Sequence, residues 1–278
     1  MNRKFAAVIA LGSLLLLVVS GMFAPEYLPP ADLSARYLGP ADVPPLGTDG
    51  RGKPLLDYAM QGAKIIALPS LIAALLVMLI ATGGGLLSCA GYGRASAMAQ
   101  AIGEVVGALP RLLVVLVVAL VLTGGAKATD APPGLYPIAL TWALLAAPGA
   151  MDEASAVASR LGGSRFVEAL RAHGFSRKRI FLYHLVGLNL RPVLVRHGVE
   201  TFMQVTFLEV ALSYLATMPP QQASFTHPAS HHSWAEILYM GYRWTLGEDS
   251  LHALLLGLGL IGLVVTVAVA ATSAVRAR

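Results

Sequence analysis

Ionisable residues inside long apolar stretches are the first candidates for chemistry in this chain. The residues of this kind are Glu104, Arg111, Glu200 and Glu209. A charged side chain within a membrane span is costly unless it faces a bundle interior or water. Glu209 is the sharpest candidate for a translocation path, and a structural hydrogen bond to a neighbouring helix is an equally weighted alternative. Glu104 lies near a predicted helix end, where its side chain would reach the interface, whereas Arg111 lies deeper and could pair with a carboxylate of a partner chain.

Two further patterns point to ligands only weakly. His227, His231 and His232 have a spacing that could bind a metal, but neither a cysteine nor a helical frame accompanies them, so a solvated loop is favoured. Gly257-x-Gly259-x-x-Gly262 fits a dinucleotide-binding pattern. It lies inside an apolar run without a preceding strand, so close packing of helices is the better interpretation.

Motifs for hydrolytic chemistry are missing from the sequence. It contains no Gly-x4-Gly-Lys-Ser/Thr segment and no His-Glu-x-x-His segment. A membrane-embedded hydrolase is therefore disfavoured, and we expect no enzymatic activity of this chain itself. If the protein uses ATP, the ATPase must be another polypeptide.

The composition is that of a membrane protein. Of 278 residues, 56% are hydrophobic and 13% charged, and a single cysteine excludes an intramolecular disulfide framework. The net charge of +5 would suit nucleic acid. However, eight basic residues against three acidic ones fall within 152–196, which marks a cytoplasmic segment under the positive-inside rule. We therefore expect membrane lipid and no nucleic acid as a partner.

Six apolar segments predict an all-α membrane protein with six transmembrane helices and both termini in the cytoplasm. The predicted helices cover 5–23, 62–87, 98–122, 134–150, 189–215 and 251–271. The organisation is a first transmembrane helix (1–24), an external segment (25–61) and a five-helix core (62–278) that contains a cytoplasmic loop at 152–187. A signal peptide is the alternative for the first helix, but its apolar core would be shorter.

The polar stretch 164–185 lies between apolar segments and is where the protein would meet a soluble partner. Ser164 can cap a short helix in which Phe166, Val167 and Leu170 share one face. Gly174 then ends that helix, because glycine tolerates the left-handed conformation. Ser176 can cap a second helix that starts with Arg177-Lys178-Arg179. The sequence thus predicts a bent pair of helices with glycine at the corner.

This stretch resembles the EAA loop of bacterial ABC-importer permeases. The likeness rests on Glu168-Ala169-Leu170, Gly174, Ile180 and His184-Leu185, and is nearest to the second permease subunit of the dipeptide, oligopeptide and nickel class. The other strong match is Leu208-Glu-Val-Ala-Leu-Ser-Tyr-Leu215, which contains Glu209. Weaker matches are Pro45-Leu-Gly-Thr-Asp49 and Pro148-Gly149, and the resemblance covers about 44–241. For Thr48 and Asp49, a structural turn is favoured over substrate contact. Gly187 stands where the family has proline, and Asp152-Glu153 where it has basic residues.

The resemblance implies a transport subunit of the bacterial inner membrane that performs no covalent chemistry. It implies a heterodimer with a sister permease, an external solute-binding protein, and two ATPase subunits that hold ATP and Mg. The cargo would be a peptide-class or other small polar solute. The residues expected to couple the chain to the ATPase are Glu168, Ala169, Leu170, Arg171, Gly174, Phe175, Ser176 and Arg177. The translocation path would include Glu209, Glu200 and Arg111.

A proton-coupled secondary transporter is the alternative. In that case Glu104, Glu200 and Glu209 would form the proton relay. Such folds often have inverted repeats with broken helices, and the sequence has no such symmetry.

Overall fold

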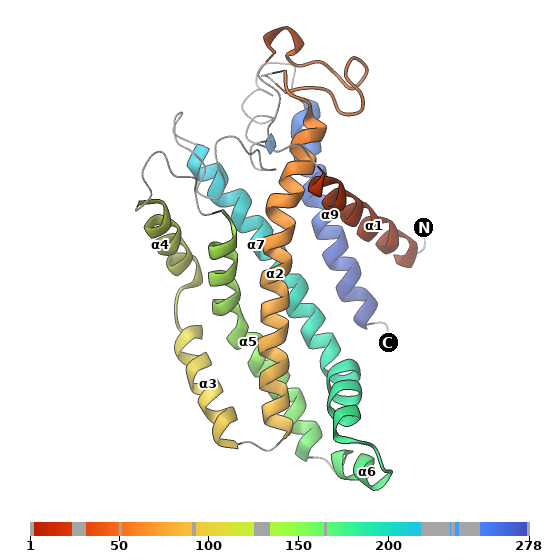
Figure 1. Ribbon diagram of the computed structural model, residues 1–278, viewed down its shortest axis with the longest axis vertical. Helices are drawn as coiled ribbons and strands as arrows, with labels where there is room; N and C mark the ends of the chain where they lie inside the picture. Colours follow the sequence, from red (N-terminus) through yellow and green to blue (C-terminus); the bar gives the residue numbers. More distant parts are fainter. Residues whose placement is uncertain are drawn as a thin grey trace. The chain divides into compact units, whose positions relative to one another are not determined.

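A computed structural model describes most of the chain, and its described part is almost wholly helical (Figure 1). The described residues are 3–23, 32–49, 52–90, 93–124, 134–163, 166–217, 234, 237–238 and 251–276. The helices are α1 (Arg3–Met22), η1 (Leu33–Ala35), α2 (Leu55–Cys89), α3 (Gly93–Gly107), α4 (Arg111–Gly124), α5 (Tyr136–Gly163), α6 (Phe166–Ala172), η2 (Arg179–Leu190), α7 (Arg191–Thr217) and α9 (Leu251–Arg276). Within these residues the only β pairing is a bridge between Thr48 and Pro54. The predicted all-helical character is confirmed.

Two helices of the described part, α2 and α9, are long and apolar enough to cross a membrane. The pair α3 and α4 adds a third if the two are counted as one broken span. A hydrocarbon core about 30 Å thick needs about 20 helical residues, and α2 has 35. The number of six spans stays a prediction.

The predicted continuous third helix over 98–122 is wrong. The chain forms α3 and α4 instead, bent by 75° at the break between them. Pro110 lies in the break, and its carbonyl accepts hydrogen bonds from Leu113 and Val114 at 3.0 and 3.1 Å. Proline has no backbone N–H to donate to the preceding turn, so the old helix ends and a new one begins.

Other helix boundaries also differ from those predicted. Helix α2 begins at Leu55, seven residues before the predicted start at 62, so the last part of the predicted external segment is helical. Helix α5 continues through Pro148 to Gly163 rather than ending near 150. Ala154, Ser155 and Ala158 are buried in this extension, and their small side chains allow close packing. The loop predicted from 152 is therefore helical up to Gly163.

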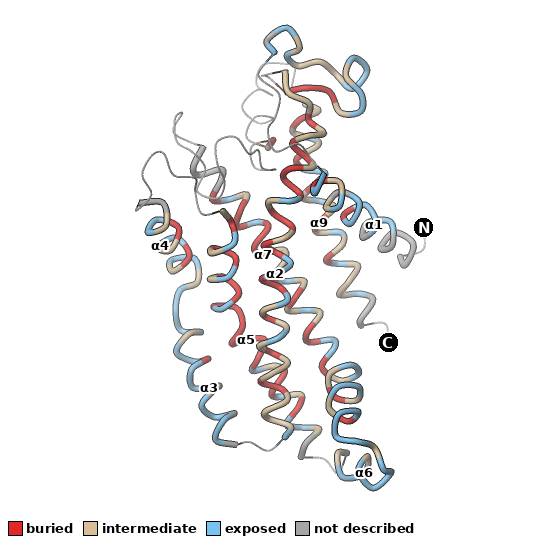
Figure 2. Tube along the Cα trace, in the orientation of Figure 1, coloured by how far each residue is buried: buried red, intermediate tan, exposed pale blue. Residues whose placement is uncertain are grey.

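The chain divides into two compact units, and Figure 2 shows burial along each. Unit 1 comprises 1–70, 119–138 and 203–270, and unit 2 comprises 71–118, 139–202 and 271–278. In unit 1, Trp234 is fully buried and donates its indole N–H to the Ala59 carbonyl at 3.0 Å. Its ring lies against Gly62, where a Cβ would come within 2.6 Å of Trp234 Nε1. Glycine at this position therefore lets the indole dock on α2.

Two polar side chains at the end of the segment 32–49 of unit 1, those of Thr48 and Asp49, are turned inward. Asp49 is buried, and its carboxylate accepts the Lys53 N–H at 2.8 Å and the Tyr58 hydroxyl at 2.5 Å. The buried Thr48 hydroxyl donates to the Ala35 carbonyl at 2.6 Å. The prediction of a structural turn at Thr48 and Asp49 is confirmed.

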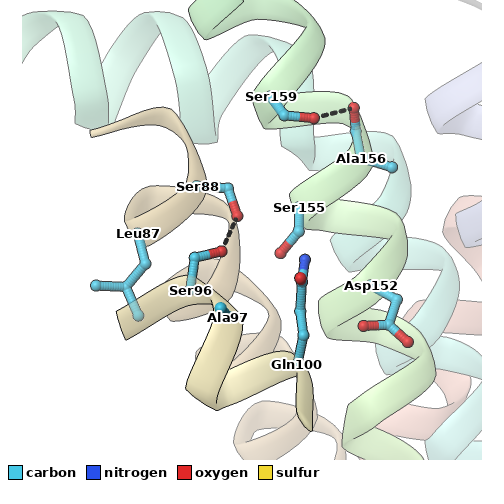
Figure 3. Close-up of a pocket in the computed structure, with 9 residues that line it drawn as sticks. All are labelled: Leu87, Ser88, Ser96, Ala97, Gln100, Asp152, Ser155, Ala156 and Ser159. Atoms are coloured by element: carbon cyan, nitrogen blue, oxygen red, sulfur yellow. Dashed lines mark hydrogen bonds between the residues drawn. The ribbon is translucent and has the colours of Figure 1, made fainter. Parts of the chain in front are cut away.

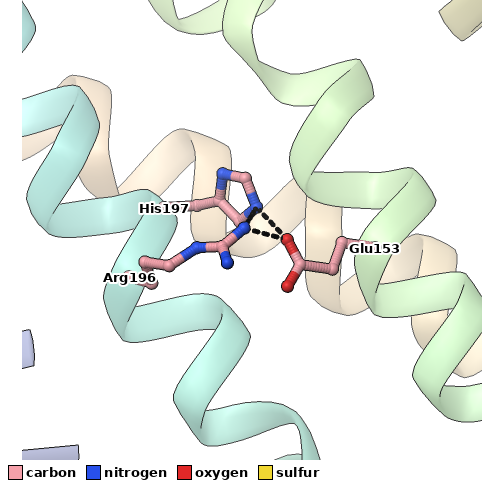
Figure 4. A network of polar contacts seen from close by, with 3 residues as sticks. All are labelled: Glu153, Arg196 and His197. Atoms are coloured by element: carbon pink, nitrogen blue, oxygen red, sulfur yellow. Dashed lines mark hydrogen bonds and ion pairs between the residues drawn. The ribbon is translucent and has the colours of Figure 1, made fainter.

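In unit 2, one carboxylate joins α5 to α7 (Figure 4). An oxygen of Glu153 lies 2.8 Å from Nε2 of His197 and also pairs with Arg196. Glu153 is one of the acidic residues that stand where the resembled family has basic ones. Its role here is to hold two helices together.

Candidate functional site

The candidate site is the polar hairpin, which we define as residues 166–185 of unit 2. Its first helix, α6, ends at Ala172. Gly174 has φ +80°, its N–H donates to the Arg171 carbonyl at 2.9 Å, and the Phe175 N–H donates to the Leu170 carbonyl at 3.1 Å. This pair of hydrogen bonds is the Schellman motif, in which the left-handed residue is usually glycine. The predicted glycine stop is confirmed.

The second arm of the hairpin begins at Ser176, as predicted. The Ser176 hydroxyl accepts the Arg179 N–H at 3.4 Å, and its carbonyl accepts the Ile180 N–H at 3.0 Å. A serine hydroxyl bound to the N–H three residues on is an N-cap. Ser164, the predicted cap of the first helix, lies outside the described residues.

The second arm then widens into the π-helix η2 and continues into α7. The side-chain amide of Asn189 donates to the His184 carbonyl at 2.6 Å. The widened helix ends just before Pro192, which cannot donate a backbone hydrogen bond. Helix α7 spans Arg191–Thr217 and confirms the fifth helix predicted over about 189–215, although the helical path that leads into it is already established at Arg179.

The outer face of the hairpin is polar and mainly basic. Arg171, Arg177, Lys178 and Arg179 are exposed, as are Glu168, Ala169 and Ser176. Leu170 and Phe175 are half-buried. Across the described part of the chain, neither the Glu168 side chain nor the Arg177 side chain has a hydrogen bond or ion pair. All eight residues predicted for ATPase coupling thus belong to one small element, and most of them face outward.

An aromatic cluster joins the turn of the hairpin to its second arm. The rings of Phe175 and His184 meet edge to face at 5.3 Å between centroids, and those of Tyr183 and His184 at 5.1 Å. The guanidinium of Arg179 lies 4.9 Å from the centre of the Phe175 ring. Such edge-to-face and cation–π contacts favour one geometry of the turn. These contacts therefore hold the turn against the second arm, while the polar face of the hairpin points outward.

The residues predicted for a translocation path belong to different units and differ in burial. Glu209 is fully buried in unit 1, on the same helix as Thr206, whose hydroxyl lies 3.5 Å from that of Ser70. Glu200 is exposed and Arg111 half-buried, and both belong to unit 2. Glu104 is exposed on α3. Of these four, only Glu209 has the burial expected for a polar group inside a helix bundle.

The metal hypothesis cannot be followed through the structure. His227, His231 and His232 lie outside the described residues. The described ranges contain no group of three or more His, Cys, Asp or Glu side chains that could hold a metal ion.

No protein-family model matches the chain, and no curated protein matches it. The likeness to importer permeases therefore rests on the residues and spacings of the sequence.

Proposed function

We propose that this chain is a permease subunit of an ATP-driven importer, coupled to a separate ATPase through the polar hairpin. The main support for the proposal is the outward face of the hairpin. The side chains of Glu168 and Arg177 are exposed there and make no hydrogen bond or ion pair among the described residues, so both can bind a partner. The element is shaped by its own Schellman turn and N-cap, so docking it costs little ordering entropy.

The chemistry of the hairpin favours a protein partner. A basic face by itself would also suit anionic lipid headgroups. However, Glu168 would be repelled by such headgroups, and in the resembled family the matching glutamate belongs to the contact with the ATPase. A groove with complementary charges of both signs accommodates Glu168 and Arg177 together.

The proposal assigns the remaining parts of the transporter to other chains. A sister permease would complete the pathway as a heterodimer, two ATPase subunits would hold ATP and Mg, and an external solute-binding protein would deliver the cargo. The cargo would be a peptide-class or other small polar solute. This chain would span the bacterial inner membrane six times with both termini in the cytoplasm.

The coupling would work by a shift between two populated conformations rather than by covalent chemistry. The hairpin leads directly into η2 and α7, a helical path that runs from Arg179 to Thr217 and carries Glu209. When the ATPases move, they would displace the hairpin and, through this path, the segment around Glu209.

The proton-relay alternative has less support. Two of its three carboxylates, Glu104 and Glu200, are exposed. Glu200 and Glu209 are nine residues apart on α7, which at about 100° per residue points them to roughly opposite sides of the helix. A relay requires groups that can exchange a proton directly or through water, and this arrangement separates them.

The test is affinity co-purification of the tagged chain from its native membrane. We expect the wild type to bring down a sister permease and an ATPase, identified by mass spectrometry. Glu168→Arg and Gly174→Pro should lose the ATPase and keep the sister permease, whereas Glu104→Arg, an exposed charge outside the hairpin, should keep both. A wild-type chain that purifies alone would overturn the importer assignment.

A further inference from the structure

A polar pocket lies in unit 2 between the end of α2, the start of α3 and the second half of α5 (Figure 3). Its volume is about 400 Å³, within the range of about 300–1,000 Å³ that is usual for sites of small molecules. Spaces between helices of a bundle are among the common places for such sites. The pocket contains none of the residues of the polar hairpin.

Some of the polar groups in the wall of the pocket are already paired. The hydroxyls of Ser88 and Ser96 are 3.0 Å apart, joining α2 to α3. The hydroxyl of Ser159 donates to the Ala156 carbonyl at 3.1 Å. A serine hydroxyl that has used its proton still has acceptor lone pairs. The Ser88–Ser96 pair therefore keeps one O–H donor besides its acceptor lone pairs, and Ser159 offers acceptors.

Other polar groups of the wall are still available. Ser155 is 4% exposed and points into the pocket, toward the amide of Gln100 (Figure 3). Over the described ranges, the side chains of Ser155, Gln100 and Asp152 have no hydrogen bond or ion pair within the protein. The Ser155 hydroxyl borders the open space of the pocket. A ligand in that space can exchange hydrogen bonds with this hydroxyl in place of water.

The charge of the wall indicates what kind of ligand would fit. Asp152 is the one charged residue of the lining, and no lysine, arginine or histidine accompanies it. An anion would be repelled by this carboxylate. A cation that carries several N–H groups would match both the carboxylate and the acceptor oxygens of the serines and of Gln100. A bare metal ion fits poorly, because Asp152 is the single carboxylate and the space holds far more than one ion.

We propose that this pocket binds a small organic ammonium ion that also bears a hydroxyl group. Asp152 pairs with the ammonium, and the buried Ser155 hydroxyl, with Gln100 beside it, binds the hydroxyl end. The proposal does not depend on the ATPase contact, because it concerns the isolated chain.

The test is isothermal titration calorimetry on the detergent-purified full chain with three probes of one length. These are 4-aminobutan-1-ol, butane-1,4-diol and 4-hydroxybutanoate, which keep the hydroxyl and make the other end cationic, neutral or anionic. We expect the amine to bind about tenfold more tightly than the diol, because its bond to Asp152 is charge-assisted. The anion should show no binding.

Variants separate the two ends of the site. Asp152→Asn should reduce amine binding to the level of the diol, and Ser155→Ala should weaken the amine and the diol by the same factor. Ala156→Leu should block all probes by filling the space without removing a polar group. Glu104→Gln, an exposed carboxylate of unit 2 outside the lining, should bind like the wild type.

Three results would overturn the proposal. They are equal binding of the three probes, no binding of the amine, and an amine preference that survives Asp152→Asn. Asp152 is exposed, so its replacement should leave the fold intact, and the circular dichroism spectrum of each variant checks this.

Discussion

The segment 32–54 and the polar hairpin carry similar residues and use them in opposite ways. In 32–54, both oxygens of the Asp49 carboxylate accept hydrogen bonds from the chain, and the Thr48 hydroxyl donates to the Ala35 carbonyl. In the hairpin, Glu168 and Arg177 face solvent without a partner among the described residues. The hydrogen bonds that shape the hairpin come from its backbone and from Ser176.

The comparison teaches how to tell a structural polar residue from one available for recognition. Both segments resemble the same family in sequence, and residue type alone does not separate them. The two segments differ in whether the side chain makes hydrogen bonds within the chain. Removal of a side chain that makes such bonds should lower stability, and removal of one that makes none should weaken binding of a partner.

The largest expected effect is that of Asp49→Ala. It leaves the buried Tyr58 hydroxyl and the Lys53 N–H without their acceptor, which should lower the free energy of unfolding by about 3 kcal/mol. Urea titration in mild detergent measures this. Asp42→Ala, an exposed acid of the same segment, should change it by less than about 0.5 kcal/mol. Equal changes in the free energy of unfolding for the two variants would contradict the structural role of Asp49, and with it the contrast between this segment and the hairpin.

The next effect is that of Gly174→Ala. At φ +80° a Cβ costs about 1–2 kcal/mol, so the hairpin should open more often. Hydrogen exchange across 166–180 should become faster while 32–49 is unchanged. Gly149→Ala is the matched control: this exposed glycine lies in α5 with nothing within 4 Å of a Cβ. The Gly149→Ala variant should be more stable by up to about 1 kcal/mol, because alanine has a higher helix propensity than glycine.

A smaller effect on stability is expected for Glu168→Gln. Glu168 lies in the first turn of α6, where a negative charge stabilises the helix by about 0.3–1 kcal/mol. The free energy of unfolding should fall by no more than that, while capture of the partner ATPase falls strongly. A large loss of stability without loss of capture would place Glu168 with Asp49 as a structural residue.

The smallest effect concerns Asp32, an exposed acid of the first segment. The Ser34 hydroxyl and then the Ser34 N–H, at 2.6 and 3.0 Å from the Asp32 carboxylate, lower the pKa of Asp32 below its ordinary 3.8. A lowered pKa means that the contribution to stability is present above pH 3.8 and is lost as pH falls through the folded-state pKa. Ser34→Ala should raise the pKa toward 3.8, which an NMR titration of the carboxyl carbon would show.

Features set by a few neighbouring residues could be predicted from the sequence. The stop at Gly174 and the cap at Ser176 depend on hydrogen bonds that span no more than five residues. Both features therefore depend only on neighbouring residues in the sequence, and both predictions are confirmed. The turn at Asp49, closed by the Gly52 N–H on the Asp49 carbonyl at 3.0 Å, is of the same kind.

Features set by packing could be predicted only in part. Each of the predicted helices over 62–87, 98–122 and 134–150 contains a proline, but only the exposed Pro110 interrupts its helix, whereas the buried Pro69 and Pro148 lie inside continuous ones. Neighbouring elements support a helix around a buried proline, and one sequence does not reveal them. The pocket could not be predicted from the sequence for the same reason. Ser88, Gln100 and Ser155 lie far apart in the chain and carry no motif.

Photo-crosslinking from position 168 in native membranes tests whether the polar hairpin contacts an ATPase. A photo-reactive amino acid replaces Glu168 in one variant and Asp42, also exposed, in another. The account predicts that position 168 crosslinks to a protein that binds ATP, and that position 42 does not. Crosslinks from position 168 only to lipid, or to no ATP-binding protein, would contradict the claim that the hairpin is the contact with an ATPase.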